Sequence, residues 1–173
     1  GSLSINKIGK DDIDEAITTV LNMAKSSMAD DAYDISEFQK AESFSKGDTE
    51  PALDMMYETY NHDKGAYFVV EEDGEIIGGA GIAALENYDG TVCELQKMYF
   101  SPKARGRGLG SKMMETCLTF AKSVGYNQCY LETMPYMDDA RKLYHKSGFK
   151  PLDKPLGDTG HYNCTRWMIK DLS

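Results

Sequence analysis

The most chemically informative part of the chain is a glycine-rich stretch, residues 105–110, with the sequence Arg-Gly-Arg-Gly-Leu-Gly. Glycines at alternate positions, Gly106, Gly108 and Gly110, allow a tight turn and leave backbone N–H groups open to a ligand. Arg105 and Arg107 add positive charge, and a helix-like run follows. Arginines, open N–H groups and a helix N-terminus all favour a bound anion, most naturally a pyrophosphate. The stretch therefore predicts a loop that binds the phosphates of a cofactor.

The spacing of this loop separates it from two common phosphate loops. No glycine stands five residues before a Gly-Lys-Ser/Thr triplet, as nucleoside-triphosphate loops require. The third glycine comes one residue too early for the dinucleotide fingerprint, which has its last glycine where Ser111 stands here. Glu132 lies at the end of the next strand-like run, where an acid could bind a ribose, so a nicotinamide cofactor stays an alternative. A glycine-rich turn without any ligand is the other alternative.

The cysteines show no arrangement that would bind a metal or form a redox pair. Cys93, Cys117, Cys129 and Cys164 are scattered, and the first three lie in apolar contexts typical of buried residues. No His/Cys/Asp cluster has the spacing of a metal site, so we predict none. The cysteine usage favours a reduced, cytoplasmic protein.

Length and charge limit the class of protein further. The 173 residues, of which 41% are hydrophobic and 27% charged, predict one globular domain over residues 1–173. No apolar run approaches the roughly 18 residues of a membrane span. The net charge of −9 is uneven: residues 1–91 hold 6 Lys/Arg against 20 Asp/Glu, and residues 92–173 hold 13 against 8. The basic half suits an anionic cofactor, and the balance argues against non-specific nucleic-acid binding. The acidic half indicates either a solvated face or steering of a cationic substrate.

Hydrophobic periodicity predicts a mixed α/β domain. Strands are expected at 3–8, 66–71, 75–85, 91–100, 127–133, 149–152 and 165–169. Helices are expected from Asp11 or Asp12 through Ala24, from residue 49 onward, at 111–124, and from Asp138 or Asp139 to Ser147. Residues 26–48 are expected to form a loop with one short helix, long enough to cover a substrate. Antiparallel hairpins dominate the first half, and one strand–loop–helix–strand crossover lies in the second.

Two local signals refine the expected hairpins. Glu72-Asp73-Gly74 is typical of a turn between the second and third strands. Glycines at 78, 79 and 81 predict a bulge in the third strand or a close approach of other groups to its backbone.

Three segments between residues 94 and 149 resemble the GNAT family of N-acetyltransferases. Residues 105–110 match the Arg-x-x-Gly-x-Gly motif that holds the acetyl-CoA pyrophosphate in that family. Residues 94–102 look like the family's fourth strand and its exit, and residues 140–149 look like its A-x-x-L-Y-x-K-x-G-F helix and strand entry. The resemblance covers residues 92–150. It implies a mostly antiparallel sheet of about seven strands flanked by helices, and acetyl-CoA as cofactor.

The resemblance also assigns residues to the cofactor. Backbone N–H groups of the loop would hold the pyrophosphate, and the fourth strand would splay from the fifth to expose groups for the pantetheine arm. The implied cofactor-binding residues are Met98, Tyr99, Phe100, Arg105, Gly106, Arg107, Gly108, Leu109, Gly110, Ser111, Lys142 and Tyr144. Met137 stands where the family often has an Asn, so one polar contact to the pantetheine is not expected here.

Catalytic roles are expected for two side chains. Tyr144 matches the family's general acid, which protonates the departing thiolate, and its spacing also suits a core tyrosine. Glu94 is the candidate base for the attacking ammonium, because it shares a strand face with Gln96 and Met98 toward the expected cleft. His161 and Tyr162 lie in a loop that borders the acceptor site in the family, and Trp167 suits the core or an interface.

The resemblance implies an acetyltransferase that acts by direct attack of an amine in a ternary complex. A small-molecule amine is the expected acceptor, and a protein N-terminus or lysine is the alternative. A binding module that keeps the acyl-CoA site without catalysis is the non-enzymatic alternative. Dimers are common in the family, so a homodimer is a further expectation.

Overall fold

The structure is a computed structural model of the chain, and it describes residues 2–9, 12–30, 58–159 and 165–173. Several expectations lie outside these residues: the loop and short helix from 31 to 48, the helix start at residue 49, and the role of His161 and Tyr162.

One seven-stranded sheet organises the described residues, with the strand order β1-β2-β3-β4-β5-β7-β6. The strands are β1 (Leu3–Lys7), β2 (Ala66–Glu72), β3 (Glu75–Ala84), β4 (Val92–Phe100), β5 (Gln128–Thr133), β6 (Lys150–Leu152) and β7 (Arg166–Asp171). Only β4 and β5 pair in parallel, and the other neighbours are antiparallel. The predicted fold class is confirmed, and each strand lies within about two residues of its predicted bounds.

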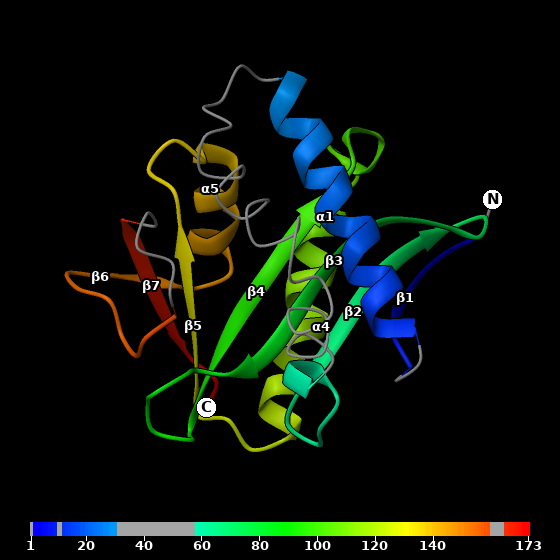
Figure 1. The fold of residues 1–173 in the computed structure, drawn as a ribbon. Helices are drawn as coiled ribbons and strands as arrows, with labels where there is room; N and C mark the ends of the chain where they lie inside the picture. Colours follow the sequence, from blue (N-terminus) through cyan, green and yellow to red (C-terminus); the bar gives the residue numbers. More distant parts are fainter. Residues whose placement is uncertain (1, 10–11, 31–57, 160–164) are drawn as a thin grey trace, which may run out of the picture.

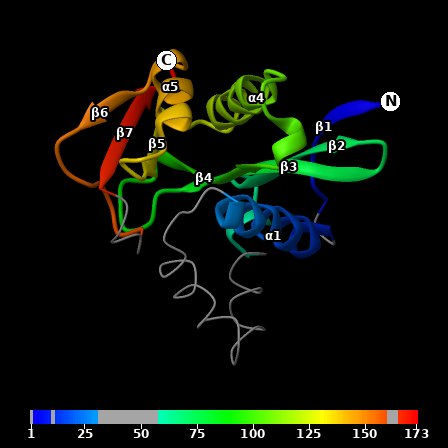
Figure 2. The ribbon, with the colours of Figure 1, turned by 90° about the horizontal axis from the view of Figure 1, so that it is seen from above.

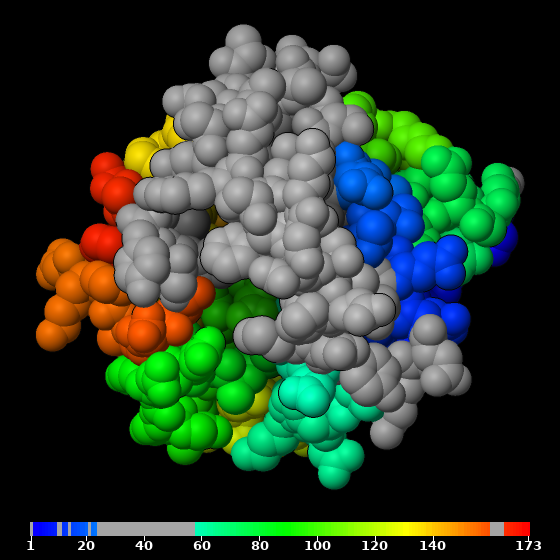
Figure 3. All heavy atoms as spheres, in the orientation of Figure 1, coloured from blue at the N-terminus to red at the C-terminus, as the bar shows by residue number. Residues whose placement is uncertain are grey.

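Helices cover both faces of this sheet (Figures 1 and 2). They are α1 (Ile13–Asp30), α4 (Leu109–Ser123) and α5 (Asp138–Lys146), with a 3₁₀ turn, η2 (Pro102–Ala104), after β4. Seen from above, α1 lies on one face, and α4 and α5 lie on the other. The space-filling view shows the surface of α1, in blue, beside the β2–β3 hairpin (Figure 3).

The two faces of the sheet carry separate hydrophobic cores. On the α4 face, apolar side chains of α4 such as Met113 pack against strand residues that include Cys93 and Leu95. On the α1 face, Ile17 of α1 packs with Tyr67 of β2. The alternation of side chains along β4 therefore sends odd-numbered residues up to Leu95 toward α4, and the residues between them toward the α1 face.

The helix ends differ from the predicted ones at two places. α1 continues to Asp30, past the predicted end at Ala24, because Ser, Met and Ala continue a helix where no Gly or Pro interrupts it. α4 begins at Leu109, two residues before the predicted start, because Gly108 takes the N-cap position with a φ of 73°. The first turn of α4 therefore belongs to the glycine loop itself.

The β2–β3 turn forms as its sequence indicates. Asp73 and Gly74 connect the strands with φ angles of 51° and 83°. Two positive φ angles are typical of the turn type that matches the twist of a hairpin, and Gly and Asp tolerate them.

The sheet opens where β4 leaves β5. Their parallel pairing covers three positions and ends at Glu94 opposite Tyr130. Beyond this point the two strands diverge, with α5 packed above the gap between them (Figure 1). The splayed strands that the resemblance implies are thus present, and Glu94 lies at the point where they separate.

Candidate active site

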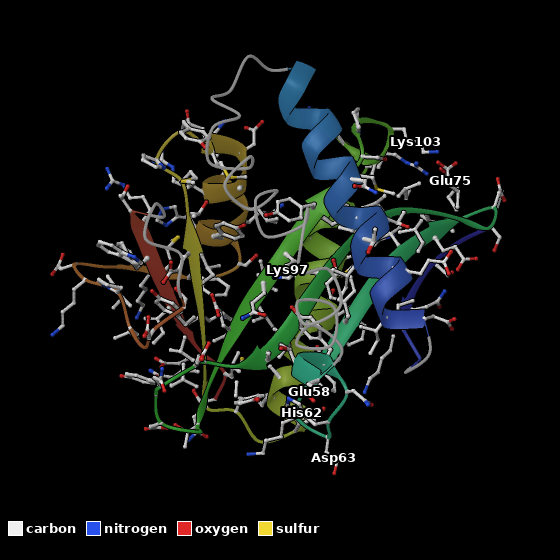
Figure 4. All side chains as sticks on the ribbon, in the orientation of Figure 1. Glu58, His62, Asp63, Glu75, Lys97 and Lys103 are labelled. Atoms are coloured by element: carbon white, nitrogen blue, oxygen red, sulfur yellow. The ribbon has the colours of Figure 1, made fainter. Side chains whose placement is uncertain are left out.

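A β-bulge interrupts β4 just after Glu94, where β4 separates from β5. Gly79 pairs with Tyr99 and Gly81 pairs with Gln96, so β4 has one more residue than β3 between these pairs. Lys97 lies in the bulge with a φ of 50°, and its carbonyl oxygen accepts a 3.1 Å hydrogen bond from the Tyr67 hydroxyl. Figure 4 shows Lys97 on β4 in the middle of the sheet. The glycine signal in the sequence therefore marks a real bulge, although the extra residue lies on β4.

The bulge corrects one predicted relationship on β4. We expected Glu94, Gln96 and Met98 to share one face of the strand. The extra residue reverses the alternation, so that Met98 packs against the core on the α4 face while Gln96 contacts Tyr60 on the α1 face. Glu94 and Gln96 remain together on the α1 face.

The glycines of β3 make room for two aromatic rings. A Cβ atom on Gly81 would lie 2.7 Å from the Tyr60 hydroxyl oxygen, and one on Gly79 would lie 2.9 Å from Cε1 of Tyr67. The two tyrosine rings contact each other edge to face, with centroids 5.3 Å apart. The predicted close approach to the β3 backbone is therefore confirmed, and it places the Tyr60 hydroxyl beside β4.

Glu94 is buried, with 3% of its surface exposed. Gln96 Nε2 donates a 2.6 Å hydrogen bond to Glu94 Oε2, and the Tyr60 hydroxyl donates a 2.8 Å bond to Gln96 Oε1. Burial raises the pKa of Glu94 to about 7, and the hydrogen bond from Gln96 partly opposes this rise. A carboxyl group with this pKa can gain and lose a proton near neutral pH.

Other charges face Glu94 from the neighbouring strands. Glu132 of β5 and Glu86, which follows β3, raise the Glu94 pKa further, and Lys97 lowers it. Glu132 Oε1 accepts hydrogen bonds from the Tyr130 hydroxyl at 2.7 Å and from the Thr159 hydroxyl at 2.9 Å. The surroundings of Glu94 are therefore acidic, and they favour a cationic acceptor group.

The glycine loop connects η2 to α4 with two residues in the left-handed region. Gly106 and Gly108 have φ angles of 71° and 73°, which other residues adopt only at a cost. A Cβ atom on either glycine would meet no heavy atom of the described residues within 4 Å. The first backbone N–H groups of α4, on Leu109, Gly110 and Ser111, have no partners within the helix. The loop and helix end therefore fit a bound pyrophosphate.

The loop meets α5 and the end of β4. A Cβ atom on Gly110 would lie 3.1 Å from Leu143 Cδ2 and 3.9 Å from Phe100 Cε2. Tyr144, next to Leu143, is buried in the same core and contacts Phe149 edge to face at 6.2 Å. The fold thus brings α5 against the glycine loop and the end of β4, from which it is distant in the sequence.

Two of the predicted cationic residues have acidic partners in the structure. Arg107 bonds to Glu72 at 2.6 Å and 3.1 Å, and Lys142 Nζ lies 3.0 Å from Asp139 Oδ1. Arg105 is exposed on the loop. Contact of these side chains with the cofactor stays a prediction.

A match to a family model identifies this arrangement. The model described as the Acetyltransferase (GNAT) family matches residues 30–149, more than half of the chain. The chain belongs to the GNAT family. It is an acetyl-CoA-dependent N-acetyltransferase.

Several relatives and solved structures resemble this GNAT chain. The uncharacterized N-acetyltransferase YjgM of Escherichia coli (strain K12) is 43% identical over 123 residues, which are 71% of this chain and 74% of the relative. The IAA acetyltransferase of Azospirillum brasilense is 29% identical, over 61% of this chain and 67% of its own length.

Two solved structures share the GNAT fold over nearly the whole chain. The PaiA N-acetyltransferase of Thermoplasma acidophilum in complex with coenzyme A has a TM-score of 0.73 at 19% identity, and the alignment covers 99% of each chain. The putative acetyltransferase YncA of Salmonella typhimurium with its cofactor acetyl-CoA has a TM-score of 0.71 at 22% identity, over 100% of this chain and 95% of that one.

The structure also adds residues that the sequence did not assign to the GNAT site. Gln96 forms a hydrogen bond with Glu94, and Tyr60 forms one with Gln96. Glu132 faces Glu94 from β5. Gln96 had a local signal, because it follows Glu94 at the strand period of two. Met137, at the N-cap of α5, is exposed and accepts a bond from the Thr133 hydroxyl, with the oxygen 3.8 Å from its sulfur atom.

The remaining candidates lie elsewhere or belong to the core. Cys93, Cys117 and Cys129 are free and buried, as predicted, and Trp167 packs against a small core cluster of Leu85, Val92 and Tyr130. A surface hollow of about 730 Å³ lies between β1–β2 and α4, away from Glu94. Within the described ranges, no group of three or more His, Cys, Asp or Glu side chains could hold a metal. The described helices include none with the length and apolar character to cross a bilayer.

Proposed function

We propose that this enzyme acetylates a primary amine of a small molecule by direct attack while both substrates are bound, and that residues 1–173 form one catalytic domain. The observation that carries the proposal is the buried Glu94, which has a pKa of about 7 at the point where β4 leaves β5. A group with this pKa is substantially ionised at neutral pH and can accept a proton from an acceptor ammonium.

The acceptor must lose a proton before it attacks. An alkyl ammonium has a pKa of about 10, so nearly all of it is charged at neutral pH. The carboxylates of Glu94 and Glu132 attract this charge, and Glu94 then removes the proton, directly or through water. The acidic surroundings of Glu94 thus support a cationic amine as the acceptor.

The glycine loop, the end of β4 and Tyr144 of α5 bind and protonate the leaving group. When bound, acetyl-CoA would supply the activated acetyl group, and coenzyme A would leave as a thiolate once the amine has taken that group. The N–H groups of the glycine loop and the charge of Arg105 hold the pyrophosphate, and β4 residues Met98 to Phe100 line the path of the pantetheine. Tyr144 donates a proton to the thiolate, because α5 places it beside the loop in the same core.

A thiol-release assay tests this proposal. The enzyme is incubated with acetyl-CoA and a panel of polyamines, amino acids, aminoglycosides and peptides. We expect turnover with a small amine, and a loss of roughly 100-fold or more in Glu94→Gln with unchanged acetyl-CoA binding. Gln in place of Glu115, an exposed residue of α4, is the matched control and should retain activity.

Other results of the same panel would overturn parts of the proposal. Turnover with peptides alone would indicate a protein N-terminus or a lysine as the acceptor. Acetyl-CoA binding without turnover of any amine would indicate a binding module. Full activity of Glu94→Gln would remove Glu94 as the base. A cytoplasmic location and a homodimer stay predictions.

A further inference from the structure

A chain of two hydrogen bonds connects a distant tyrosine to Glu94. The Tyr60 hydroxyl donates to Gln96 Oε1 at 2.8 Å, and Gln96 Nε2 donates to Glu94 Oε2 at 2.6 Å. Tyr60 belongs to the helical residues 58–60 before β2, whereas Gln96 and Glu94 lie on β4. The three side chains meet on the α1 face of the sheet.

Packing fixes the first member of this chain. Tyr60 is buried, and its ring lies against the β3 backbone at Gly81, where any side chain would collide with it. The ring of Tyr67 contacts it edge to face. Burial raises the pKa of Tyr60 well above its usual value, with Glu94 adding to the effect, so its hydroxyl keeps its proton and stays a donor.

The donor character of Tyr60 orients the amide of Gln96. An amide presents one oxygen that accepts and one nitrogen that donates. Because Tyr60 donates to the oxygen, the nitrogen of Gln96 points to Glu94 and can only donate to it. A donor at this place stabilises the ionised carboxylate more than the neutral acid.

We propose that Gln96 and Tyr60 are positioning residues of this enzyme, which orient the Glu94 carboxylate and keep it ionised for the incoming amine. The inference rests on the proposed function of Glu94 as the base. Neither residue needs to touch a substrate for this role.

The other charges near Glu94 cannot replace this hydrogen bond. Glu132 and Glu86 oppose ionisation, as does burial itself. Lys97, in the bulge, favours ionisation, but its effect on the Glu94 pKa is smaller than that of Gln96. The Tyr60 hydroxyl acts on Glu94 through the Gln96 amide. Loss of the Gln96 amide should therefore raise the Glu94 pKa.

The test is a carbon-13 NMR titration of the glutamate carboxyl groups, with the Glu94 signal assigned by its absence in Glu94→Gln. Gln96→Met preserves the length of the side chain without its donor, and we expect the Glu94 midpoint to rise by about one pH unit. Tyr60→Phe should raise it by less, because the amide remains but is no longer held. Gln128→Met is the matched control, since Gln128 donates at 2.7 Å to Asp171, a carboxylate on β7, and it should not move the Glu94 midpoint.

The pH dependence of kcat/KM, with an amine from the thiol-release panel, separates this role from a structural one. The acidic limb should move upward in parallel with the NMR midpoint, whereas a purely structural residue would lower the rate at every pH. An unchanged NMR midpoint in Gln96→Met would overturn the inference. A shifted midpoint with an unmoved rate profile would show that Glu94 is not the base, and would remove the catalytic role of all three residues.

Discussion

Arg107 of the glycine loop forms a two-point ion pair with Glu72 at the end of β2, with Nη2–Oε1 and Nη1–Oε2 distances of 2.6 Å and 3.1 Å. The hydrogen bond from Arg107 lowers the pKa of Glu72, so the carboxylate stays charged. The pair ties the loop to the β2–β3 hairpin. It also places a negative charge beside the loop that is expected to hold a pyrophosphate.

Replacement of Glu72 should strengthen cofactor binding. In Glu72→Gln the carboxylate charge is lost and Arg107 becomes available to the phosphates, so we expect acetyl-CoA to bind roughly threefold tighter at low salt. The melting temperature should change little, because exposed ion pairs contribute little to stability. Calorimetric titration at two salt concentrations measures the effect. Glu75→Gln is the matched control. Glu75 lies on the same hairpin as Glu72, and it pairs at 2.5 Å with Lys103 of η2 (Figure 4). Weaker binding in Glu72→Gln would show that the pair holds the loop in its binding shape.

The glycine loop could be predicted because its determinants are contiguous in the sequence. Gly106 and Gly108 need positive φ angles, and the residues that follow them form a helix with a clear apolar stripe. The β2–β3 turn was predictable for the same reason, since Asp73 and Gly74 are residues that tolerate its backbone. Such local signals determine the order of the elements.

The surroundings of Glu94 could not be predicted, because they depend on contacts between distant residues. Tyr60 and Gln96 are 36 residues apart, and their contact requires a helical turn placed over a glycine of β3. The glycines of β3 indicated a bulge, but no local signal placed its extra residue on β4, since lysine does not favour the positive φ that Lys97 adopts there. The predicted face of Met98 was wrong for this reason.

The burial of Glu94 should make stability depend on pH. Its pKa is about 7 in the folded protein, above its ordinary value of 4.5. A raised folded pKa contributes stability that is complete below the unfolded pKa and is lost as the pH rises through the folded one. The free energy of unfolding of Glu94→Gln, relative to the wild type, should therefore increase by roughly 3 kcal/mol between about pH 4 and pH 8.

Urea unfolding at a series of pH values measures this difference. The difference between the variant and the wild type removes the contributions of the other titrating groups. Glu115→Gln is again the control. Glu115 is exposed, so its replacement removes no buried carboxyl group. A pH-independent difference for Glu94→Gln would contradict the raised pKa of Glu94.

Removal of the Tyr144 hydroxyl should slow the chemistry without loosening the fold. The ring of Tyr144 contacts Phe149 in the core, and Phe at this position would keep that contact. We expect Tyr144→Phe to lower thiol release by roughly 10- to 100-fold with unchanged acetyl-CoA affinity. Tyr126→Phe is a suitable control, because the buried hydroxyl of Tyr126 has no hydrogen-bond partner among the described residues. Equal rates for the two variants would exclude Tyr144 as the acid.

The proposed reaction requires the glycine loop at the start of α4 to bind the pyrophosphate of acetyl-CoA. Calorimetric titration of acetyl-CoA into Gly108→Val and Gly125→Val tests it most directly. Gly108 and Gly125 flank the two ends of α4 with φ angles of 73° and 90°, and a Cβ atom at either position would meet no heavy atom of the described residues within 4 Å. Both variants should lose about 1–2 kcal/mol of stability from backbone strain. We predict that Gly125→Val binds acetyl-CoA like the wild type and that Gly108→Val shows no binding heat. Equal binding by both variants would contradict the claim.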